Sequence, residues 1–126
     1  MKSVEILPLK SLGPDNRGKT YEFTINPTKG FLFLIRKKGT VSGNTYQKGG
    51  NSATNPKTFI LLNGSIILHI KPVDSDKIKQ LSISEPSIIK IAPYITHAIE
   101  AKTDIQLLEA ASLVEIVEDR IKDHIV

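Results

Sequence analysis

The apolar residues of this 126-residue chain occur in short runs that are separated by Gly, Pro, Asn and Asp. Isoleucine is frequent in these runs, as expected of β-branched residues on a pleated, half-buried surface. No long helical period is present before residue 114. The pattern therefore indicates an all-β protein. The runs predict strands at residues 21–25, 31–35, 58–62, 65–70, 79–83, 87–91, 98–101 and 105–110.

Turn residues set the ends of several of these strands. Asn63-Gly64 lies between two runs and is the strongest two-residue hairpin signal, so the strands on either side of it are predicted to pair. The first run is predicted to end at Asn26-Pro27. The run at 31–35 has no polar residue and is typical of a buried strand.

Short strands at regular spacing predict a β-sandwich or a β-barrel. A closed barrel or a double-sheet jelly roll is favoured because it protects the strand edges, and the absence of Cys and Trp argues against an antibody-type domain. The length predicts a single domain over residues 1–126. We expect N-terminal strands or an arm at 1–26, a barrel core at 27–112 and a C-terminal segment at 113–126. The tail 114–125 fits either a strand followed by one helical turn or a short amphipathic helix.

The composition excludes several classes of site. With no cysteine, the chain has no disulfide scaffold, zinc finger, iron–sulfur site or thiol nucleophile. Any metal would need His, carboxylate or amide ligands, and the histidines are His69, His97 and His124. The N-terminus carries an acid and a proline where a signal peptide has an apolar core, and no apolar run approaches the roughly 18 residues of a spanning helix. We therefore expect a cytoplasmic protein without a membrane partner.

The net charge of +4 raises the question of a nucleic-acid partner. The excess is almost all lysine, spread along the chain, and the 3 Tyr and 4 Phe do not interleave with a basic stripe. Nucleic-acid surfaces favour Arg for forked contacts and aromatic side chains for stacking. We therefore expect no nucleic-acid partner, while an anionic small molecule remains open.

Two parts of the chain resemble the motifs of a known family. Residues 39–49 and 55–64 together look like the first cupin motif, which contains a glycine, an H-x-H pair, a glutamate and a closing glycine. Residues 86–97 look like the second motif, which ends in P-x-x-x-H, here at His97. In order and spacing the chain resembles the cupin superfamily, the RmlC-like jelly rolls. Residues 15–23 and 109–120 resemble segments of cupins in polysaccharide and nucleotide-sugar biosynthesis and of sugar-phosphate isomerase cupins.

The resemblance implies a double-stranded β-helix barrel, and a homodimer in which residues 4–12 cross to the partner. It also implies a metal site of three His and one carboxylate, from which this sequence departs. Thr45 and Gln47 stand at the H-x-H positions, and Lys57 stands at or beside the glutamate. Because His97 is then the one remaining ligand, we expect no metal and no other cofactor.

The same positions suggest what the barrel holds instead. Strand alternation puts Thr45 and Gln47 on one face, and the resemblance implies that Lys57 and His97 also point inward. Hydroxyl, amide, ammonium and imidazole groups suit a small polar or anionic ligand, such as a sugar or nucleotide sugar, with Arg36 as a further candidate contact for a phosphate. Alternatively, these side chains fill the barrel and bond to one another or to water.

An enzymatic function is the alternative to simple binding. The resemblance includes metal-independent epimerases and ketoisomerases of nucleotide sugars, in which a base removes a proton next to a ketone. His97 is the candidate base, and Tyr94 or Tyr46 the candidate acid. The family's base lies in the first motif, where this chain has Thr45 and Gln47, so whether the protein is an enzyme stays open.

The remaining polar residues have ordinary structural interpretations. His69 is expected at the surface or hydrogen-bonded in the core, and His124 in solvent. The mixed-sign run Glu118-Asp119-Arg120 is typical of an exposed face. The loops Ser42-Gly43-Asn44 and Lys48-Gly49-Gly50-Asn51 could hold an anion with their N–H groups, although turn geometry is the simpler interpretation.

Overall fold

The computed structural model describes residues 3–25 and 27–126, and this part of the chain is almost entirely β-structure. Its single helix, α1, spans Leu113–Val117, and no helix in the described residues is long and apolar enough to cross a membrane. The strands are β1 (Val4–Pro8), β2 (Lys10–Asp15), β3 (Gly18–Glu22), β4 (Leu32–Arg36), β5 (Val41–Gln47), β6 (Lys57–Asn63), β7 (Ile66–Pro72), β8 (Lys79–Ile83), β9 (Ser87–Ile91), β10 (Ile95–Ala101), β11 (Ile105–Glu109) and β12 (Arg120–Lys122).

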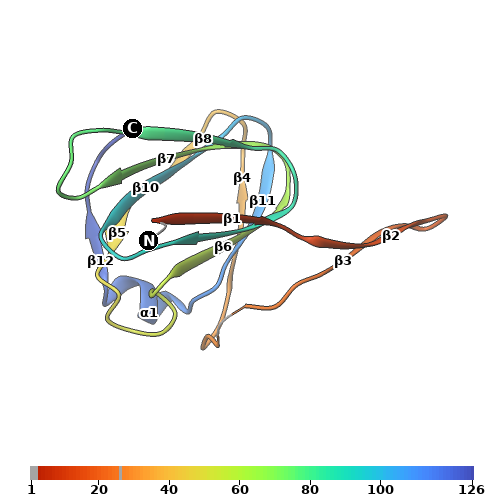
Figure 1. Cartoon of the computed structure of the whole chain (residues 1–126), viewed down its shortest axis with the longest axis horizontal. Coiled ribbons are helices and arrows are strands. Elements are labelled where there is room, and N and C mark those ends of the chain that lie inside the picture. The colour runs from red at the N-terminus through yellow and green to blue at the C-terminus, as the bar shows by residue number, and fades with distance from the viewer. Residues whose placement is uncertain (1–2, 26) are drawn as a thin grey trace.

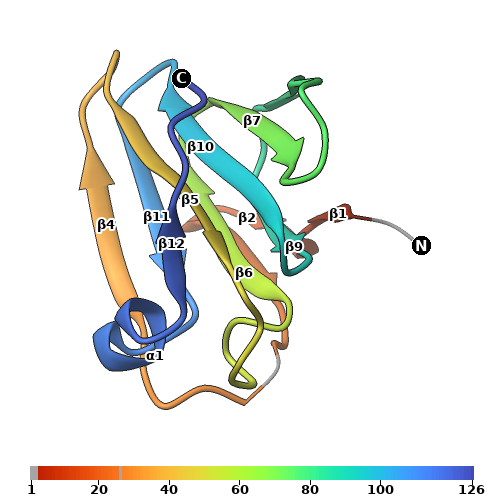
Figure 2. The same cartoon turned by 90° about the vertical axis from the view of Figure 1, so that its left-hand side faces the viewer.

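The strands form two antiparallel five-stranded sheets that enclose the barrel (Figures 1 and 2). One sheet has the order β1-β9-β6-β11-β4 and the other the order β12-β5-β10-β7-β8. From β4 onward the chain passes repeatedly from one sheet to the other, with β7 and β8 as the one consecutive pair in the same sheet. This arrangement confirms the predicted all-β jelly roll.

The apolar core fills the part of the barrel beside β7, β8 and β9. Alternate residues of each strand point inward, as the pleat requires. They include Leu61 on β6, Leu68 on β7 and Ile89 on β9, all fully buried. On β4, β5, β6, β10 and β11 the inward series continues into polar side chains, and it is there that a cavity opens.

The N-terminal segment adds an edge strand to the first sheet and covers part of its outer face. β1 pairs with β9 of the same chain, and β2 and β3 form a two-stranded ribbon that projects from the body (Figure 1). Leu9, Tyr21 and Ile25 pack on the outer face of β6 and β9. The strand predicted at 21–25 is instead β3, which ends at Glu22, and the predicted turn residue Asn26 lies outside the described residues.

The hairpin predicted at Asn63-Gly64 is wrong. The turn exists, but it carries the chain from β6 in one sheet to β7 in the other. β6 already pairs with β9 and β11, and β7 with β8 and β10, so neither strand has an edge left for the other. Gly64 has a φ of 96°, and a Cβ there would lie 2.5 Å from the Asp104 carbonyl oxygen.

Strand β4 is less buried than its apolar sequence predicts. It is an edge strand, and Phe33 and Ile35 on its outer face are 58% and 63% exposed. Leu32 and Leu34 point the other way and are half-buried. The continuous apolar run of β4 therefore has one face that is covered by the barrel and one that is exposed, whereas a buried strand would have both faces covered.

The C-terminal segment contains a short helix, as one of the two predicted arrangements had it, and this helix is followed by a strand that was not predicted. Ser112 begins α1 with a capping box, in which its Oγ accepts from Glu115 N at 3.3 Å and Glu115 Oε1 accepts from Ser112 N at 2.8 Å. β12 then pairs with β5, where Arg120 lies opposite Gln47. Figure 2 shows β12 beside β5. This pairing brings Arg120 to the cavity.

Candidate functional site

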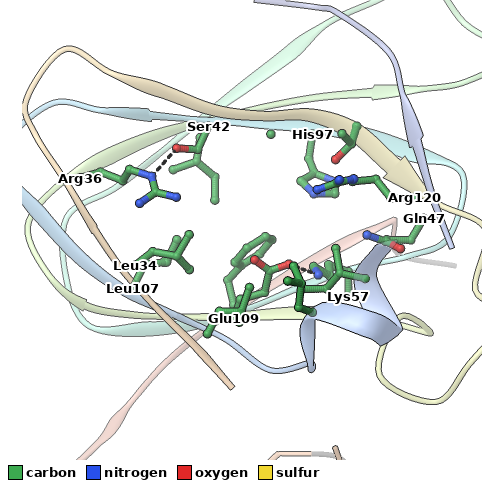
Figure 3. A pocket seen from close by; sticks show the side chains of 16 residues that line it. Leu34, Arg36, Ser42, Gln47, Lys57, His97, Leu107, Glu109 and Arg120 are labelled. Atoms are coloured by element: carbon green, nitrogen blue, oxygen red, sulfur yellow. Dashed lines mark hydrogen bonds and ion pairs between the residues drawn. The ribbon is translucent and has the colours of Figure 1, made fainter. Parts of the chain in front are cut away.

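A cavity of about 220 Å³ opens between the two sheets and is closed on one side by α1 (Figure 3). Its polar lining comes from the inward positions of β4, β5, β6, β10, β11 and from β12. Its apolar lining comes from the same strands and from α1. The residues are Leu32, Leu34, Arg36, Ser42, Gly43, Thr45, Gln47, Lys57, Phe59, His97, Ile99, Leu107, Glu109, Leu113, Ile116 and Arg120.

The structure brings Thr45, Gln47, Lys57, His97 and Arg36 around this one cavity. Strand alternation is the reason: each of these side chains occupies an inward position on its strand. Their roles in binding a ligand stay a prediction. The sequence reasoning missed Glu109, Ser42 and the cavity position of Arg120.

Lys57 and Glu109 form a buried ion pair on the cavity wall. Lys57 is 1% exposed and Glu109 8%, and Lys57 Nζ contacts Glu109 Oε2 (Figure 3). Burial lowers the pKa of Lys57 below its ordinary value, against the opposing attraction of Glu109. Glu109 follows Ile105 and Leu107 on the inward face of β11, and a charged residue at the end of this apolar series was the available sequence signal.

One buried polar atom of the cavity, Gln47 Oε1, lacks a hydrogen-bond partner among the described residues. Lys57 Nζ is paired with the Glu109 carboxylate. A buried polar atom without a partner costs free energy. A hydroxyl group that donates to Gln47 Oε1 would remove that cost.

His97 is a neutral group at the back of the cavity. Burial lowers its pKa to about 4, while a hydrogen bond to Ile95 acts to raise it and the Lys57 charge lowers it further. His97 Nδ1 lies 3.3 Å from the Ile95 carbonyl oxygen, which fixes Nδ1 as the donor and leaves Nε2 as an acceptor. The ring packs edge-on to Phe59.

Arg36 and Arg120 add positive charge to the lining. Arg36 Nε donates to Ser42 Oγ at 2.9 Å, and Nη1 donates to the Ile35 carbonyl at 3.2 Å. Neither guanidinium has a carboxylate partner in the described part of the chain. Figure 3 shows the two arginines at opposite sides of the cavity. Five donors on each planar guanidinium suit the oxygens of a phosphate or carboxylate.

The prediction of an exposed Glu118-Asp119-Arg120 run is wrong for Asp119. Its carboxylate is buried and accepts from Gly50 N at 2.7 Å and Gly49 N at 2.9 Å. The loop Lys48-Gly49-Gly50-Asn51, which was named as a possible anion site, therefore binds the carboxylate of Asp119 from the same chain. Arg120, the next residue, lines the cavity because β12 lies beside β5.

Tyr46 and Tyr94 do not line the cavity. Alternation turns Tyr46 to the opposite face from Thr45 and Gln47, and its ring centroid lies 5.7 Å from that of Tyr94. Tyr94 is exposed in the turn before β10, with a φ of 62°. The expectation that either tyrosine serves His97 as an acid therefore has no support from this placement.

The other two histidines have the structural settings expected of them. His69 is buried, and its Nε2 lies 3.0 Å from Glu100 Oε1. His124 is exposed near the C-terminus. Neither borders the cavity.

A divalent metal, which many cupins bind, does not fit the side chains of this cavity. One imidazole, one amide and two hydroxyl groups line the cavity with a carboxylate that already pairs with an ammonium group. The positive charge of Lys57 would repel a metal ion. Within residues 3–25 and 27–126, no group of three or more His, Asp or Glu side chains is placed to hold one.

Comparison of the whole structure with solved structures identifies the fold. A sugar 3,4-ketoisomerase, QdtA from Thermoanaerobacterium thermosaccharolyticum in complex with TDP, superposes with a TM-score of 0.76 at 17% identity, covering 98% of this chain and 90% of that one. The dTDP-4-dehydrorhamnose 3,5-epimerase from Sulfolobus tokodaii superposes with a TM-score of 0.70 at 18% identity, covering 100% and 74%.

A third similar structure is the capsular polysaccharide assembling protein CapF from Staphylococcus aureus, with a TM-score of 0.63 at 23% identity, covering 94% of this chain and 35% of that one. No family model matches the sequence, and no curated protein sequence does. At these identities the likeness establishes the fold, the RmlC-like cupin jelly roll that the sequence resemblance implied.

Proposed function

We propose that the protein binds a sugar or nucleotide sugar in the barrel cavity. The observation that carries the proposal is the pair of guanidinium groups, Arg36 and Arg120, which border a polar cavity without carboxylate partners in the described residues. A nucleotide sugar offers a diphosphate for such groups and hydroxyl groups for Gln47, whose Oε1 has no partner in the part of the chain that the structure describes. The fold supports the same ligand class, because the similar QdtA structure contains TDP.

Titration calorimetry with TDP, TDP-4-keto-6-deoxyglucose and unphosphorylated glucose tests this proposal. We expect binding of the nucleotides to weaken with salt, and to weaken roughly tenfold or more in Arg36→Ala and in Arg120→Ala, because each removes a charged hydrogen-bond donor. Arg17→Ala is the matched control, since Arg17 pairs with Asp15 on the projecting ribbon. Failure of every nucleotide to bind, or equal affinity in all three variants, contradicts the proposal.

The same titrations decide between binding and a filled barrel. If the polar side chains only bond to one another or to water, no ligand of the panel binds. An isomerase or epimerase that uses His97 with Tyr94 or Tyr46 is the enzymatic alternative, and the similar ketoisomerase and epimerase folds are consistent with it. Since both tyrosines lie outside the cavity lining, such an enzyme would need its acid from elsewhere.

We further propose that the protein is a homodimer through the outer face of the β1-β9-β6-β11-β4 sheet. Phe31, Phe33 and Ile35 are exposed in or beside edge strand β4 and form an apolar strip there. Light scattering after gel filtration should give the mass of a dimer, and the double variant Phe33→Asp/Ile35→Asp the mass of a monomer. Val73→Asp, in the loop after β7, is the control. A monomeric parent protein contradicts this proposal.

A further inference from the structure

Residues 119–126, here called the C-terminal strap, bring Arg120 to the cavity and are fastened to the barrel at both ends. Resting on the proposed nucleotide-sugar site, we propose that Asn44 is a positioning residue that controls ligand affinity through Arg120. Binding inside the cavity and attachment of the strap outside the barrel should then strengthen each other.

The first attachment of the strap places Arg120 at the cavity. Gly49 N and Gly50 N both donate to the Asp119 carboxylate, and β12 then pairs with β5. Arg120 lies opposite Gln47 in this pairing. Residues directly opposite each other in an antiparallel pair project from the same face, so Arg120 follows Gln47 into the cavity (Figure 3).

Asn44 makes four hydrogen bonds with the other end of the strap. Its main-chain oxygen accepts from Asp123 N at 2.8 Å, and its Oδ1 accepts from Ile125 N at 2.9 Å and from Val126 N at 3.0 Å. Its Nδ2 donates to the Val126 main-chain oxygen at 3.1 Å. Asn44 has a φ of 58°, a left-handed conformation that asparagine tolerates better than most side chains. This position therefore suits asparagine both for its backbone and for its side-chain contacts.

Between these two attachments, burial contributes little to holding the strap. None of residues 120–126 is buried in the described structure, and the three residues of β12 are all exposed. Asp123 Oδ2 also accepts from Thr96 Oγ1 at 2.5 Å, on the outer face of β10. Segments with few buried apolar contacts open locally at a low free-energy cost. The hydrogen bonds of Asn44 therefore determine how firmly the strap, and with it Arg120, is held.

The two contacts on one segment are coupled, and such coupling is reciprocal. A phosphate oxygen that binds Arg120 would hold β12 against β5, which also keeps the N–H groups of Ile125 and Val126 on Asn44. Loss of the Asn44 side chain would leave Arg120 on a loosely held segment. Arg36 belongs to β4, at the opposite side of the cavity, and should not depend on the strap (Figure 3).

A double-mutant cycle with TDP, measured by titration calorimetry, tests this role. Asn44→Gly removes the side chain and keeps the left-handed backbone without steric cost. We expect it to weaken TDP binding roughly three- to tenfold, the size of a net hydrogen-bond contribution. In the Arg120→Ala background the same change should weaken binding less than about twofold, because the group through which it acts is already gone. In the Arg36→Ala background the full effect should persist.

A matched substitution elsewhere controls for the chemical change itself. Asn63→Gly removes the same side chain at the exposed end of β6 and should leave the affinity for TDP within about twofold of the parent value.

Amide hydrogen exchange supplies a second readout, which a purely structural role of Asn44 would not produce. Saturating TDP should slow exchange at Ile125 N and Val126 N by roughly threefold or more in the parent protein. In Arg120→Ala, saturating TDP should leave these exchange rates unchanged. Protection that is absent from the parent protein, or equal in the two proteins, overturns the positioning role.

The calorimetry separates failure of this role from failure of the site. Equal affinity of Asn44→Gly and the parent for TDP overturns the positioning role, and so does an equal loss with and without Arg120, since Asn44 would then act through the fold. In both cases the parent binds TDP and the proposed site stands. If the parent binds no nucleotide, the proposed site fails and the role of Asn44 fails with it.

Discussion

The carboxylate of Asp119 accepts a hydrogen bond from Gly50 N at 2.7 Å, across the gap between the C-terminal segment and the loop after β5. Gly49 N donates to the same carboxylate at 2.9 Å. A Cβ on Gly50 would lie 2.8 Å from Asp119 Oδ1, so a larger residue there would displace the carboxylate from its present position. Because Arg120 follows directly and lines the cavity, this contact holds one wall of the candidate site in position.

Loss of the Asp119 charge should destabilise the fold and loosen that wall. Asp119→Asn leaves the N–H groups of the Gly49-Gly50 loop with a weaker acceptor, and we expect a loss of about 1–3 kcal/mol in the free energy of unfolding. Urea denaturation measures it. Asp76→Asn, in the exposed loop between β7 and β8, makes the same chemical change as a control. Equal urea midpoints for the two variants would contradict a structural role for Asp119.

Acid should weaken the fold through the same carboxylate. Burial acts to raise the pKa of Asp119, but hydrogen bonds from Gly50, Thr54 and Gly49 outweigh it and hold the pKa below its ordinary value of 3.8. Its stabilising contribution is therefore complete above pH 3.8 and is lost as the pH falls through the lower pKa of the folded state. Urea titrations at a series of acidic pH values should show Asp119→Asn and the parent protein converging. If the free energies of unfolding of the two proteins differ by the same amount down to the lowest pH, protonation of Asp119 does not cause the acid destabilisation.

Local patterns predicted the strands and the faces of their side chains. The strands at 79–83 and 87–91 have the predicted bounds, and alternation correctly put Thr45 and Gln47 on one face. Both features depend on residues that are close together in the sequence, because side chains alternate between the two faces of a pleated strand.

Contacts between distant parts of the chain could not be predicted from local sequence patterns. Asn63-Gly64 has the chemistry of a hairpin turn, yet the strands beside it find their partners elsewhere. The burial of Asp119 depends on a loop far along the chain, and a mixed-sign run carries no sign of it. The pairing of Lys57 with Glu109 likewise follows from the β6–β11 register rather than from either strand alone.

The turn between β6 and β7 should tolerate substitution less well than another glycine turn. Gly64 has a φ of 96°, and a Cβ there would meet Asp104, Ile105 and Thr103 atoms at 2.5–2.8 Å. Gly39 has a φ of 89°, but a Cβ there would have no atom of residues 3–25 or 27–126 within 4 Å beyond its chain neighbours. Gly39→Ala should therefore cost about 1–2 kcal/mol for its backbone conformation alone. Gly64→Ala should cost about 1–3 kcal/mol more because of overpacking, which thermal unfolding would measure. Equal costs would show that the contacts at Gly64 relax freely.

The buried Lys57–Glu109 pair should contribute little to net stability but be costly to break. Removing one charge leaves the other buried without a partner, so Lys57→Met and Glu109→Leu should each cost about 3–5 kcal/mol. The double variant replaces the pair with apolar side chains and should lie near the parent in stability, since burying two charges costs about as much as their attraction returns. Urea unfolding of all four proteins measures the coupling. The exposed pair Lys10 and Glu22 is the control, and its coupling should be close to zero. If the two single costs at the buried pair simply add in the double variant, the two charges do not depend on each other and the pair is not coupled.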